Sequence, residues 1–513
     1  MRTALLVIPL ALAIVTPAHA QDRPLSAADS SLVRGILTAE DRRDSTASAL
    51  TTGVRHTDPR INLLARRALD RIRDPKFAAR DSFPALPAPP KYADPAWRLR
   101  LRELATKRTD CAAMRLALSD SAWPVRLTAA DRVAPECGSD LALVRTLTDW
   151  AAKPATRAVR SRGGVSWHPA AHAIIALARL APNRARSALP ALASSPIPWL
   201  RTYAAKAAGT LKDTTTLRRL ARDANDNVKE AAIDALAVVA GHAADDEYVA
   251  ALSATGYQAV RAGARALKGS PRGRPLLVPL LTATDRIAKD SSETSRDVRI
   301  AIIERIGELL AGETGFGMSL PGTFDCAVTR AIDSVMTRAG ATGGPGTRCA
   351  PLAITLPPDA TALALGRDVR LRVTMADSSG GGSFTVKLRG DVAPLMAARV
   401  LELARSGYYN GLTWHRVEPD FVIQGGGKGA NEYVGHPRFI RDELGTVPHV
   451  RGAVGMSTRG HDTGDAQWFV NLRDNLRLNA DYTVFAEVVD GIDVVDGMLE
   501  GDVIARIEVL PRG

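Results

Sequence analysis

The sequence predicts a multidomain α + β protein in which a long array of paired helices precedes a strand-rich C-terminal domain. Three observations lead to this prediction. A chain of 513 residues is too long for one hydrophobic core. The first two-thirds is rich in Ala, Leu and Arg, which favours helices, and aromatic residues make up only 5% of the chain. After that region, the spacing of apolar residues changes from a period of about 3.6 to a period of about 2.

The first twenty residues have the pattern of a signal peptide. Arg2 gives a positive start, residues 4–15 form a short apolar run, and Ala18-His19-Ala20 is a small-x-small cleavage pattern. The mature chain is therefore expected to begin at Gln21. An uncleaved membrane anchor is the alternative, but the apolar run is too short to span a bilayer comfortably. We expect an exported protein, periplasmic or secreted, without a membrane anchor.

From residue 21 to residue 340 the pattern is one helix after another. In a recurring phrase, a turn residue, an apolar residue and then Arg or Lys precede an Ala-rich amphipathic run. Its copies include residues 58–60, 123–126, 198–201, 227–229, 259–261 and 297–299, with a degenerate copy at 168–169. Spacings of about 30–40 residues are typical of an α-solenoid, and the phrase resembles one found in HEAT-type repeats. An irregular helical domain is the alternative.

Four cysteines form two pairs that are local in the sequence, Cys111 with Cys137 and Cys326 with Cys349. In an exported protein this spacing favours two disulfides. A zinc site is the alternative, but the sequence has no C-x-x-C pair or nearby Cys/His pair that would support it.

The chain is basic, with a net charge of +12 and a pI of about 9.8. Most of the Arg residues are interleaved with Asp and Glu along the helical stretches, and no compact Lys/Arg block with aromatic residues is present. This distribution indicates a solvated basic surface, and we expect no nucleic-acid partner.

A Gly- and Pro-rich stretch ends the helical region, and residues 341–365 are expected to form a linker. Beyond it, residues 369–375 and 383–388 alternate between apolar and polar side chains and flank a Gly/Ser-rich turn. This pattern predicts a β-hairpin that opens a new domain over residues 366–513.

Ordered motifs follow the hairpin. They are Trp414-His415-Arg416-Val417 with Phe421-Val422-Ile423-Gln424-Gly425-Gly426, then residues 439–443, residues 452–457 with 465–470, and residues 478–486. In order and spacing they closely resemble the motifs of the cyclophilin-type peptidyl-prolyl isomerases. The resemblance implies an eight-stranded antiparallel β-barrel closed by two helices, the first of them at residues 393–406.

The resemblance also implies roles for nine residues. Arg416 would donate to the proline nitrogen of the twisted amide, Gln424 would orient Arg416, and Phe421 would line the proline pocket. The other six would bind the substrate: Phe469, Gln467, Leu478, Tyr482, Ser457 and Thr458.

The chemistry of amide rotation explains why an apolar pocket and an arginine suffice for catalysis. Rotation about an X–Pro bond has a barrier of about 18–20 kcal/mol because of amide resonance. A catalyst needs a pocket for the pyrrolidine ring and a fixed donor that favours the twisted amide over the planar one. Arg suits this role because its guanidinium keeps its charge. No metal or cofactor is expected.

Several residues depart from the family pattern or invite another interpretation. Arg477 stands where many cyclophilins have Trp, which implies weak cyclosporin sensitivity. His415 is expected to pack or cap, and His449 and His461 lie on loops without a partner at metal-binding spacing. The run of glycines around Lys428 lacks the first Gly and the final Ser/Thr of a phosphate-binding loop, so we interpret it as a turn.

The sequence therefore predicts a peptidyl-prolyl cis-trans isomerase that acts on proline-containing segments of exported proteins and assists their folding. The alternative is a non-catalytic scaffold that binds proline peptides and proteins, with the helical solenoid as its functional surface. Under either hypothesis a protein partner could bind the solenoid. A solenoid regulator of a nucleic-acid process would conflict with the signal peptide.

Overall fold

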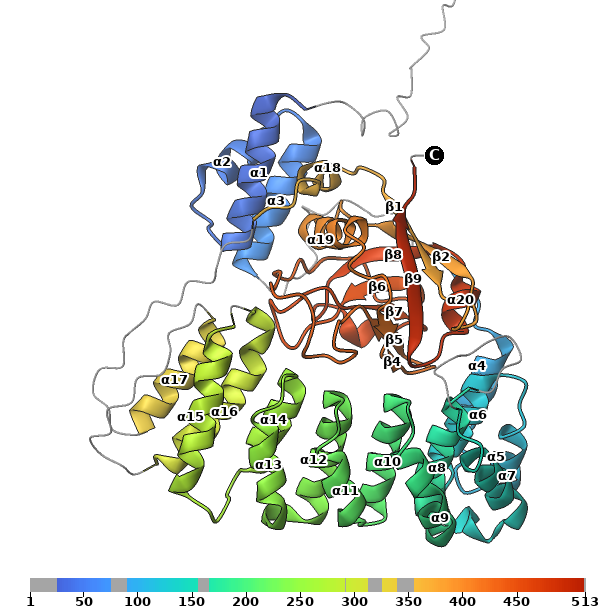
Figure 1. Ribbon diagram of the computed structural model, residues 1–513. Coiled ribbons are helices and arrows are strands. Elements are labelled where there is room, and N and C mark those ends of the chain that lie inside the picture. Colours follow the sequence, from blue (N-terminus) through green and yellow to red (C-terminus); the bar gives the residue numbers. More distant parts are fainter. Residues whose placement is uncertain are drawn as a thin grey trace, which may run out of the picture.

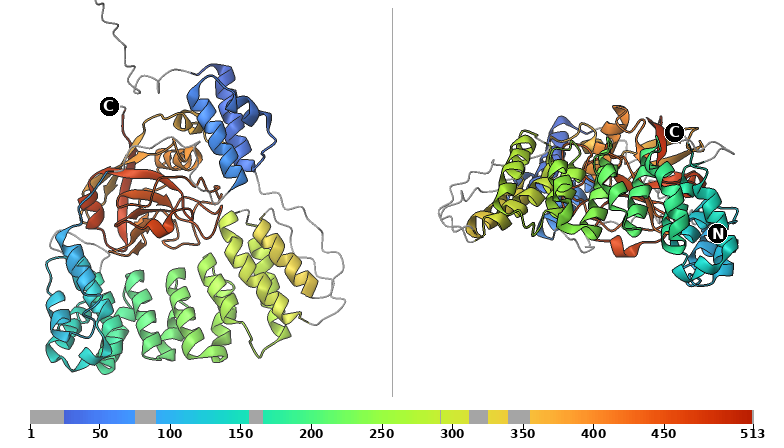
Figure 2. Two further views of the ribbon diagram at one scale, coloured as in Figure 1. Left: turned by 180° about the vertical axis from the view of Figure 1, so that it is seen from behind. Right: turned by 60° about the horizontal axis from the view of Figure 1, so that its bottom comes forward.

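The computed structural model describes residues 25–74, 90–155, 166–290, 292–311, 325–338 and 355–511. The predicted signal peptide and residues 341–354 of the predicted linker lie outside these ranges. The described residues form a curved array of helices, a β-barrel on the inner side of its curve, and a small helical bundle against the barrel (Figure 1). The view from behind shows the same three parts (Figure 2). Within the described ranges, no helix has the length and apolar character needed to cross a bilayer.

The array consists of stacked helix pairs. Its helices are α4 (Ala96–Glu103), α5 (Cys111–Ala117), α6 (Trp123–Arg132), α7 (Leu141–Ala151), α8 (His168–Leu180), α9 (Pro182–Ala193), α10 (Pro198–Thr210), α11 (Thr214–Leu220), α12 (Asp226–Val239), α13 (Asp245–Ala251), α14 (Tyr257–Ala266), α15 (Leu277–Ala288), α16 (Arg296–Leu309) and α17 (Cys326–Arg338). Helices α8, α10, α12, α14 and α16 pack side by side, and α9, α11, α13 and α15 pair with them. One apolar core runs from Leu101 to Leu310. This is solenoid packing, and the assignment to the HEAT type stays a prediction.

The recurring phrase lies at the start of inner helices. Leu200 in α10 and Val228 in α12 are fully buried in the core. The basic residue that follows the apolar one reaches the loops instead, since Nε of Arg201 lies 2.7 Å from Oδ2 of Asp223 and Nη1 donates to the carbonyl of Ser195 at 2.8 Å. The apolar side chain thus fixes the helix to the core, and the basic side chain ties neighbouring turns together.

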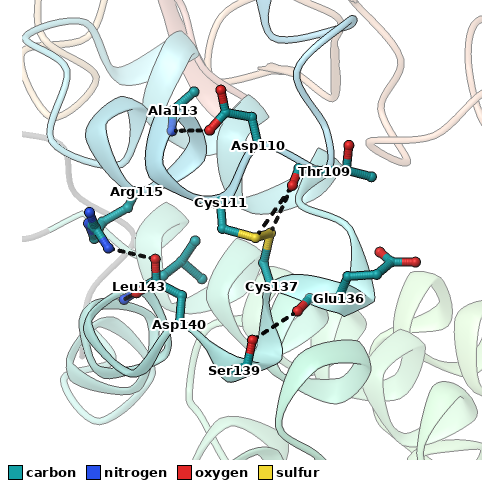
Figure 3. Close-up of a disulfide and its surroundings, with 10 residues drawn as sticks. All are labelled: Thr109, Asp110, Cys111, Ala113, Arg115, Glu136, Cys137, Ser139, Asp140 and Leu143. Carbon is teal, nitrogen blue, oxygen red and sulfur yellow. Dashed lines mark hydrogen bonds and ion pairs between the residues drawn. A yellow bond between two sulfur atoms is a disulfide. The ribbon is translucent and has the colours of Figure 1, made fainter.

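The first predicted disulfide is present. Cys111 at the start of α5 is bonded to Cys137, in a short 3-10 helix over Pro135–Ser139 (Figure 3). Cys137 is buried in the core of the array. Cys349, the partner predicted for Cys326, lies outside the described residues, so the second pairing stays a prediction.

The C-terminal part is a closed antiparallel barrel. Its strands are β1 (Arg370–Met375), β2 (Ser383–Leu388), β3 (Thr413–Trp414), β4 (Arg416–Val417), β5 (Val422–Gly425), β6 (Ala453–Met456), β7 (Trp468–Asn471), β8 (Val484–Asp490) and β9 (Asp502–Val509). They are hydrogen-bonded in the order β3-β9-β1-β2-β8-β6-β7-β5-β4. The two end strands, β3 and β4, are consecutive in the chain, so they close the barrel. Nine strands replace the eight expected because the segment 413–417 breaks at His415 into two short strands.

Two helices accompany the barrel, α19 (Pro394–Arg405) and the short α20 (Ile492–Asp496). Helix α19 was expected at residues 393–406. This range corresponds to the observed helix together with its N-cap, Ala393, and its C-cap, Ser406. Its N-terminus is held by Glu443, whose carboxylate accepts hydrogen bonds from the backbone N–H groups of Leu395 and Met396 at 3.1 and 2.8 Å. This carboxylate satisfies donors that a helix start leaves unpaired.

The small bundle consists of α1 (Ala27–Arg42), α2 (Ser48–Val54) and α3 (Pro59–Arg73), and it shares one apolar core with the barrel and α18 (Ala360–Ala364). Arg71 is buried at the contact, where Nη1 bonds Oε1 of Glu40 at 2.8 Å and Nη2 donates to the carbonyl of Val392 at 2.7 Å. The core thus divides differently from the predicted boundary. The helices before residue 74 pack with the barrel, whereas α4–α16 form the separate core of the array.

The array touches the barrel at several places along its curve. The hydroxyl of Tyr203 in α10 donates to Oε2 of Glu500 at 2.7 Å. Next to it, Gly501 has a positive φ of 82°, which disfavours other residues, and a Cβ there would lie in tight contact, 3.1 Å from Nε1 of Trp199. Further along, Asn227 in α12 accepts a hydrogen bond of 2.9 Å from the amide of Asn431. The barrel is therefore fixed against the inner side of the array.

Candidate functional site

One row of residues crosses four neighbouring strands of the barrel. Arg416 on β4 is paired with Gln424 on β5, Gln424 with Phe469 on β7, and Phe469 with Gly455 on β6. Residues directly opposed on antiparallel strands point to the same face of a sheet. The strand pairing therefore brings a cation, an amide and an aromatic ring together on one face.

Hydrogen bonds hold the polar half of this row. Nη1 of Arg416 donates to Oε1 of Gln424 at 3.3 Å, and Nε2 of Gln424 donates to Oγ of Ser457 at 2.8 Å. Gln424 is buried, so both ends of its amide are needed to satisfy it. As a result, the amide connects the guanidinium to Ser457, which directly follows β6 on the far side of the site.

The side chain of Arg416 is 40% exposed, and two carboxylates lie near its guanidinium. Nε lies 2.9 Å from Oε1 of Glu418, and Nη1 lies 3.7 Å from Oε1 of Glu432. An exposed ion pair contributes little to stability. It does restrict the guanidinium, and this leaves a fixed cation at the mouth of the site.

Beside Arg416 lies a small apolar cluster. Val422, Phe469 and Leu478 are buried there, and Phe421 and Tyr482 pack against them half-buried. The rings of Phe469 and Tyr482 meet edge to face at 5.7 Å, a favourable geometry for aromatic pairs. The half-buried rings of Phe421 and Tyr482 lie against this buried base and present an apolar surface with the character needed for a proline ring. We call this cluster of five side chains the apolar recess.

Arginine side chains flank this recess. The guanidinium carbon of Arg477 lies 4.5 Å from the ring centroid of Phe421, and that of Arg416 lies 5.9 Å from the same centroid. Cation–π attraction favours both positions. Arg477, where many cyclophilins have Trp, therefore lies at the edge of the apolar recess and contributes to its charge.

His449 supports the recess from within. It is fully buried, and its ring stacks on Phe469 at 5.6 Å with an interplanar angle of 19°. Its Nε2 lies 3.1 Å from the carbonyl of Tyr482, so this nitrogen carries the proton, and Nδ1 accepts from the amide of Asn471 at 3.2 Å. Burial lowers the pKa of His449, which keeps the ring neutral in this arrangement.

Gly455 leaves room for the ring of Phe469. A Cβ at residue 455 would lie 2.4 Å from Cζ of Phe469, far inside van der Waals contact. The ring of Phe469 thus lies over a strand position where only glycine leaves it room.

The remaining predicted residues lie along the rim. The backbone N–H of Ser457 donates to the carbonyl of Gln467 at 2.8 Å, and the amide Nε2 of Gln467 donates to the carbonyl of Glu432 at 3.2 Å. Oε1 of Gln467 is buried and has no hydrogen-bond partner among the described residues. Thr458 follows Ser457 and is half-buried. This rim offers backbone and amide groups next to the apolar recess.

Taken together, the nine residues predicted from the sequence lie in one region, as the row, the cluster and the rim. The arrangement has the parts that amide rotation needs: an apolar surface for the proline ring and a positioned N–H donor beside it. Sequence reasoning missed the supporting roles of His449 and Gly455. The sequence indicates for His449 only a loop position without a partner at metal-binding spacing. Among the described residues, no group of three or more His, Cys, Asp or Glu side chains is placed to hold a metal ion.

His415 packs inside the barrel, as expected from the sequence. It is buried between β3 and β4, and burial, assisted by the neighbouring charge of Arg416, lowers its pKa to about 4. The ring is therefore neutral at pH 7. His461 is exposed and pairs with Asp442 at 2.9 Å.

Comparison with known proteins identifies relatives of the C-terminal part. The family described as cyclophilin type peptidyl-prolyl cis-trans isomerase/CLD matches residues 371–509. Peptidyl-prolyl cis-trans isomerase B of Bacillus subtilis is 36% identical over 131 residues, which cover 25% of this chain and 92% of that protein. A peptidyl-prolyl cis-trans isomerase of Helicobacter pylori is 34% identical over 134 residues, which cover 25% of this chain and 83% of that protein.

Among solved structures, a Cryptosporidium parvum cyclophilin type peptidyl-prolyl cis-trans isomerase determined in the presence of the dipeptide Ala-Pro is 21% identical. The match covers 28% of this chain and 99% of that chain, with a TM-score of 0.26.

Proposed function

The chain belongs to the cyclophilin-type peptidyl-prolyl cis-trans isomerase family, and from this premise we propose that it isomerises X–Pro bonds of exported proteins and thereby assists their folding. The row from Arg416 to Gly455 carries the proposal, because it joins a fixed cation to an apolar recess. Isomerisation of X–Pro bonds takes tens of seconds or longer without a catalyst, so it can limit folding.

The mechanism follows from the geometry of the site. The proline ring enters the recess of Phe421, Phe469 and Leu478, with Tyr482 at its edge. Gln467 and the backbone at Ser457 and Thr458 hold the residues before the proline. As the amide twists, its nitrogen becomes pyramidal and gains a lone pair, to which Arg416 donates. This interaction exists only in the twisted state, so it accelerates rotation.

Two observations support exported clients. Residues 1–20 have the pattern of a signal peptide, with an apolar run and the Ala18-His19-Ala20 cleavage pattern. The disulfide between Cys111 and Cys137 fits an oxidising compartment such as the periplasm or the cell exterior. Newly exported proteins fold in the same compartment and are the clients that such an enzyme would meet.

The experiment compares the full chain with Arg416→Ala in a prolyl-isomerisation assay on an X-Pro peptide. We expect the variant to lose at least about tenfold in kcat/KM, which corresponds to roughly 1.4 kcal/mol of transition-state stabilisation. The fold should survive because the guanidinium is partly solvated. Normal turnover in a folded variant would rule out this mechanism.

Export is tested separately. The chain is expressed with its native N-terminus in a Gram-negative host, and the N-terminal residue of the purified protein is determined by mass spectrometry. A mature chain that begins at Gln21 in the periplasmic fraction or the medium supports the proposal. An intact N-terminus in the cytoplasmic fraction contradicts it.

The alternative is a scaffold that binds proline peptides with little turnover. It predicts tight peptide binding together with an isomerisation rate close to the uncatalysed one, in both the parent chain and Arg416→Ala. The fixed position of Arg416 beside the recess favours the enzyme, because a binding module has no need for a donor specific to the twisted amide.

A further inference from the structure

The turn over residues 418–421 forms one wall of the prolyl site. The backbone N–H of Phe421 donates to the carbonyl of Glu418 at 2.9 Å, which closes the turn. One end of the turn provides the aromatic ring of the recess, and the other provides the carboxylate that lies 2.9 Å from Nε of Arg416. A small tilt of this turn would therefore move both the wall and the neighbour of the donor.

Helix α4 of the array holds this turn from outside the barrel. In Figure 1, α4 lies at the end of the array beside the barrel, far from the barrel in sequence. Its Arg98 is fully buried and donates from Nε to the carbonyl of Pro419 at 3.2 Å. Nη2 of the same side chain bonds Oδ1 of Asp496 at 2.7 Å, so Arg98 joins the turn to α20.

Arg102, one helical turn further along α4, holds the next residue of the wall. Its Nε lies 2.8 Å from Oδ1 of Asp420, and its Nη1 lies 2.7 Å from Oδ2 of Asp94. Asp420 directly precedes Phe421. The guanidinium thus bridges a carboxylate of the helical array and a carboxylate of the catalytic wall with separate nitrogen atoms.

The barrel also contacts this turn. Arg473 reaches Oδ2 of Asp420 at 3.1 Å, and the carbonyl of Phe421 accepts hydrogen bonds of 3.0 Å from the backbone of Leu472 and the side chain of Asn475. These bonds fix the end of the turn where β5 begins. In its outer part, α4 contacts the carbonyl of Pro419 and Oδ1 of Asp420, whereas Arg473 contacts Oδ2 of Asp420.

We propose that Arg102 is a positioning residue for the isomerase reaction, supported by Arg98, and that the helical array is thereby part of the catalytic apparatus. The proposal rests on the roles given above to Phe421 and Arg416. It goes beyond them by making the activity of the barrel depend on a residue that lies outside the barrel and does not touch substrate.

Arg100 provides a matched control. It lies two residues before Arg102 on α4 and also forms a two-point ion pair, from Nε and Nη2 to Asp120 at 2.7 and 2.8 Å. Asp120 belongs to the array, so the substitution Arg100→Ala removes an equivalent pair of hydrogen bonds without touching the wall.

The test measures kcat and KM separately for the full chain, Arg102→Ala, Arg102→Lys and Arg100→Ala. We expect Arg102→Ala to lose about fivefold in kcat/KM, mostly through KM because the recess is less well formed. Arg102→Lys, which keeps a positive charge near Asp420, should recover part of this loss. Arg100→Ala should stay within about twofold of the parent.

A purely structural role would lower the unfolding temperature of Arg102→Ala and leave the kinetics of its folded fraction unchanged. That result overturns the proposal, as do equal kinetics for Arg102→Ala and Arg100→Ala. If Arg102→Ala does not fold, Asp420→Ala removes the same contact from the barrel side, and Arg473→Ala controls for the other partner of Asp420. Normal kcat/KM in folded Asp420→Ala would then overturn the proposal. A parent chain without isomerase activity would instead contradict the proposed function.

Discussion

Arg416 and Gln424 occupy directly opposed positions on β4 and β5, and a hydrogen bond of 3.3 Å joins their side chains. Because the same amide donates to Ser457 at 2.8 Å, the position of the guanidinium depends on a chain of three side chains that spans the site.

The first prediction concerns Gln424. Replacing it with Leu keeps the volume of the side chain and removes both hydrogen bonds, so Arg416 loses its fixed position and a buried partner. We expect kcat/KM to fall by about three- to tenfold, the effect of one to two neutral hydrogen bonds. Prolyl-isomerisation kinetics measure the change, and thermal unfolding checks the fold. Unchanged kinetics would mean that Arg416 does not need the amide.

The second prediction concerns Gly455. In Gly455→Ala the new methyl group collides with Phe469, whose ring must leave its place in the recess. We expect a loss of at least about tenfold in kcat/KM, because close-packed sites do not absorb an added methyl group without a shift.

The control for this substitution is Gly497→Ala. A Cβ at residue 497 would meet its nearest atoms at an ordinary distance of 3.5 Å, and the position follows α20, outside the residues of the site. Equal activity of Gly455→Ala and Gly497→Ala would show that the position of the Phe469 ring does not matter for catalysis.

The third prediction is a pH dependence of stability caused by His415. Its pKa is lowered to about 4 by burial and by Arg416, compared with about 6.5 in an unfolded chain. The unfolded chain therefore binds the proton first as the pH falls. The stabilisation is complete above about pH 6.5 and is lost as the pH falls towards 4, by up to about 1.4 kcal/mol per pH unit.

Denaturant unfolding between pH 7 and pH 4 measures this effect in the parent chain and in His415→Gln, which has no titrating group at this position. The variant should show a shallower loss of stability over the same range. An identical pH dependence would mean that His415 is protonated as easily in the folded chain as in the unfolded one.

The fourth prediction concerns the disulfide Cys111–Cys137, which closes a loop over 26 positions of the chain. Replacing both cysteines with Ser frees this loop in the unfolded state, and we expect the free energy of unfolding of the array to fall by about 2–4 kcal/mol. Denaturant titration of the parent and the variant measures the difference. Labelling of thiols in the denatured, unreduced parent should find none, and any labelled cysteine would contradict one of the two predicted pairs.

How much of the site could be predicted depends on whether its parts belong to strands or to loops. Arg416 and Gln424 belong to one short hairpin, whose two strands pair them once it folds, so a local motif that resembles the cyclophilin pattern was enough to indicate both. His449 lies on a loop and stacks on Phe469 only because the barrel closes. No local pattern in the sequence indicates which ring a loop residue will meet.

Contacts between distant segments also limited the prediction of the fold. Amphipathic spacing correctly predicted that α1–α3 would be helices with one apolar face. It also led to their assignment to the repeat region, since periodicity tells which face is buried and not what covers it. The buried contact of Arg71 with Val392 belongs to a pairing between distant segments, which helical periodicity alone does not reveal.

The shared core of α1–α3 and the barrel also determines the order in which the chain can fold. During synthesis, α3 is completed at Arg73 long before β1 begins at Arg370, a delay on the order of tens of seconds at about 5–20 residues per second. Until then the bundle has no barrel to cover its apolar face. The solenoid, whose core is its own, can fold in the interval. A peptidyl-prolyl isomerase of this design would itself fold last at its catalytic end, and its newly made chains would be the ones most in need of a chaperone.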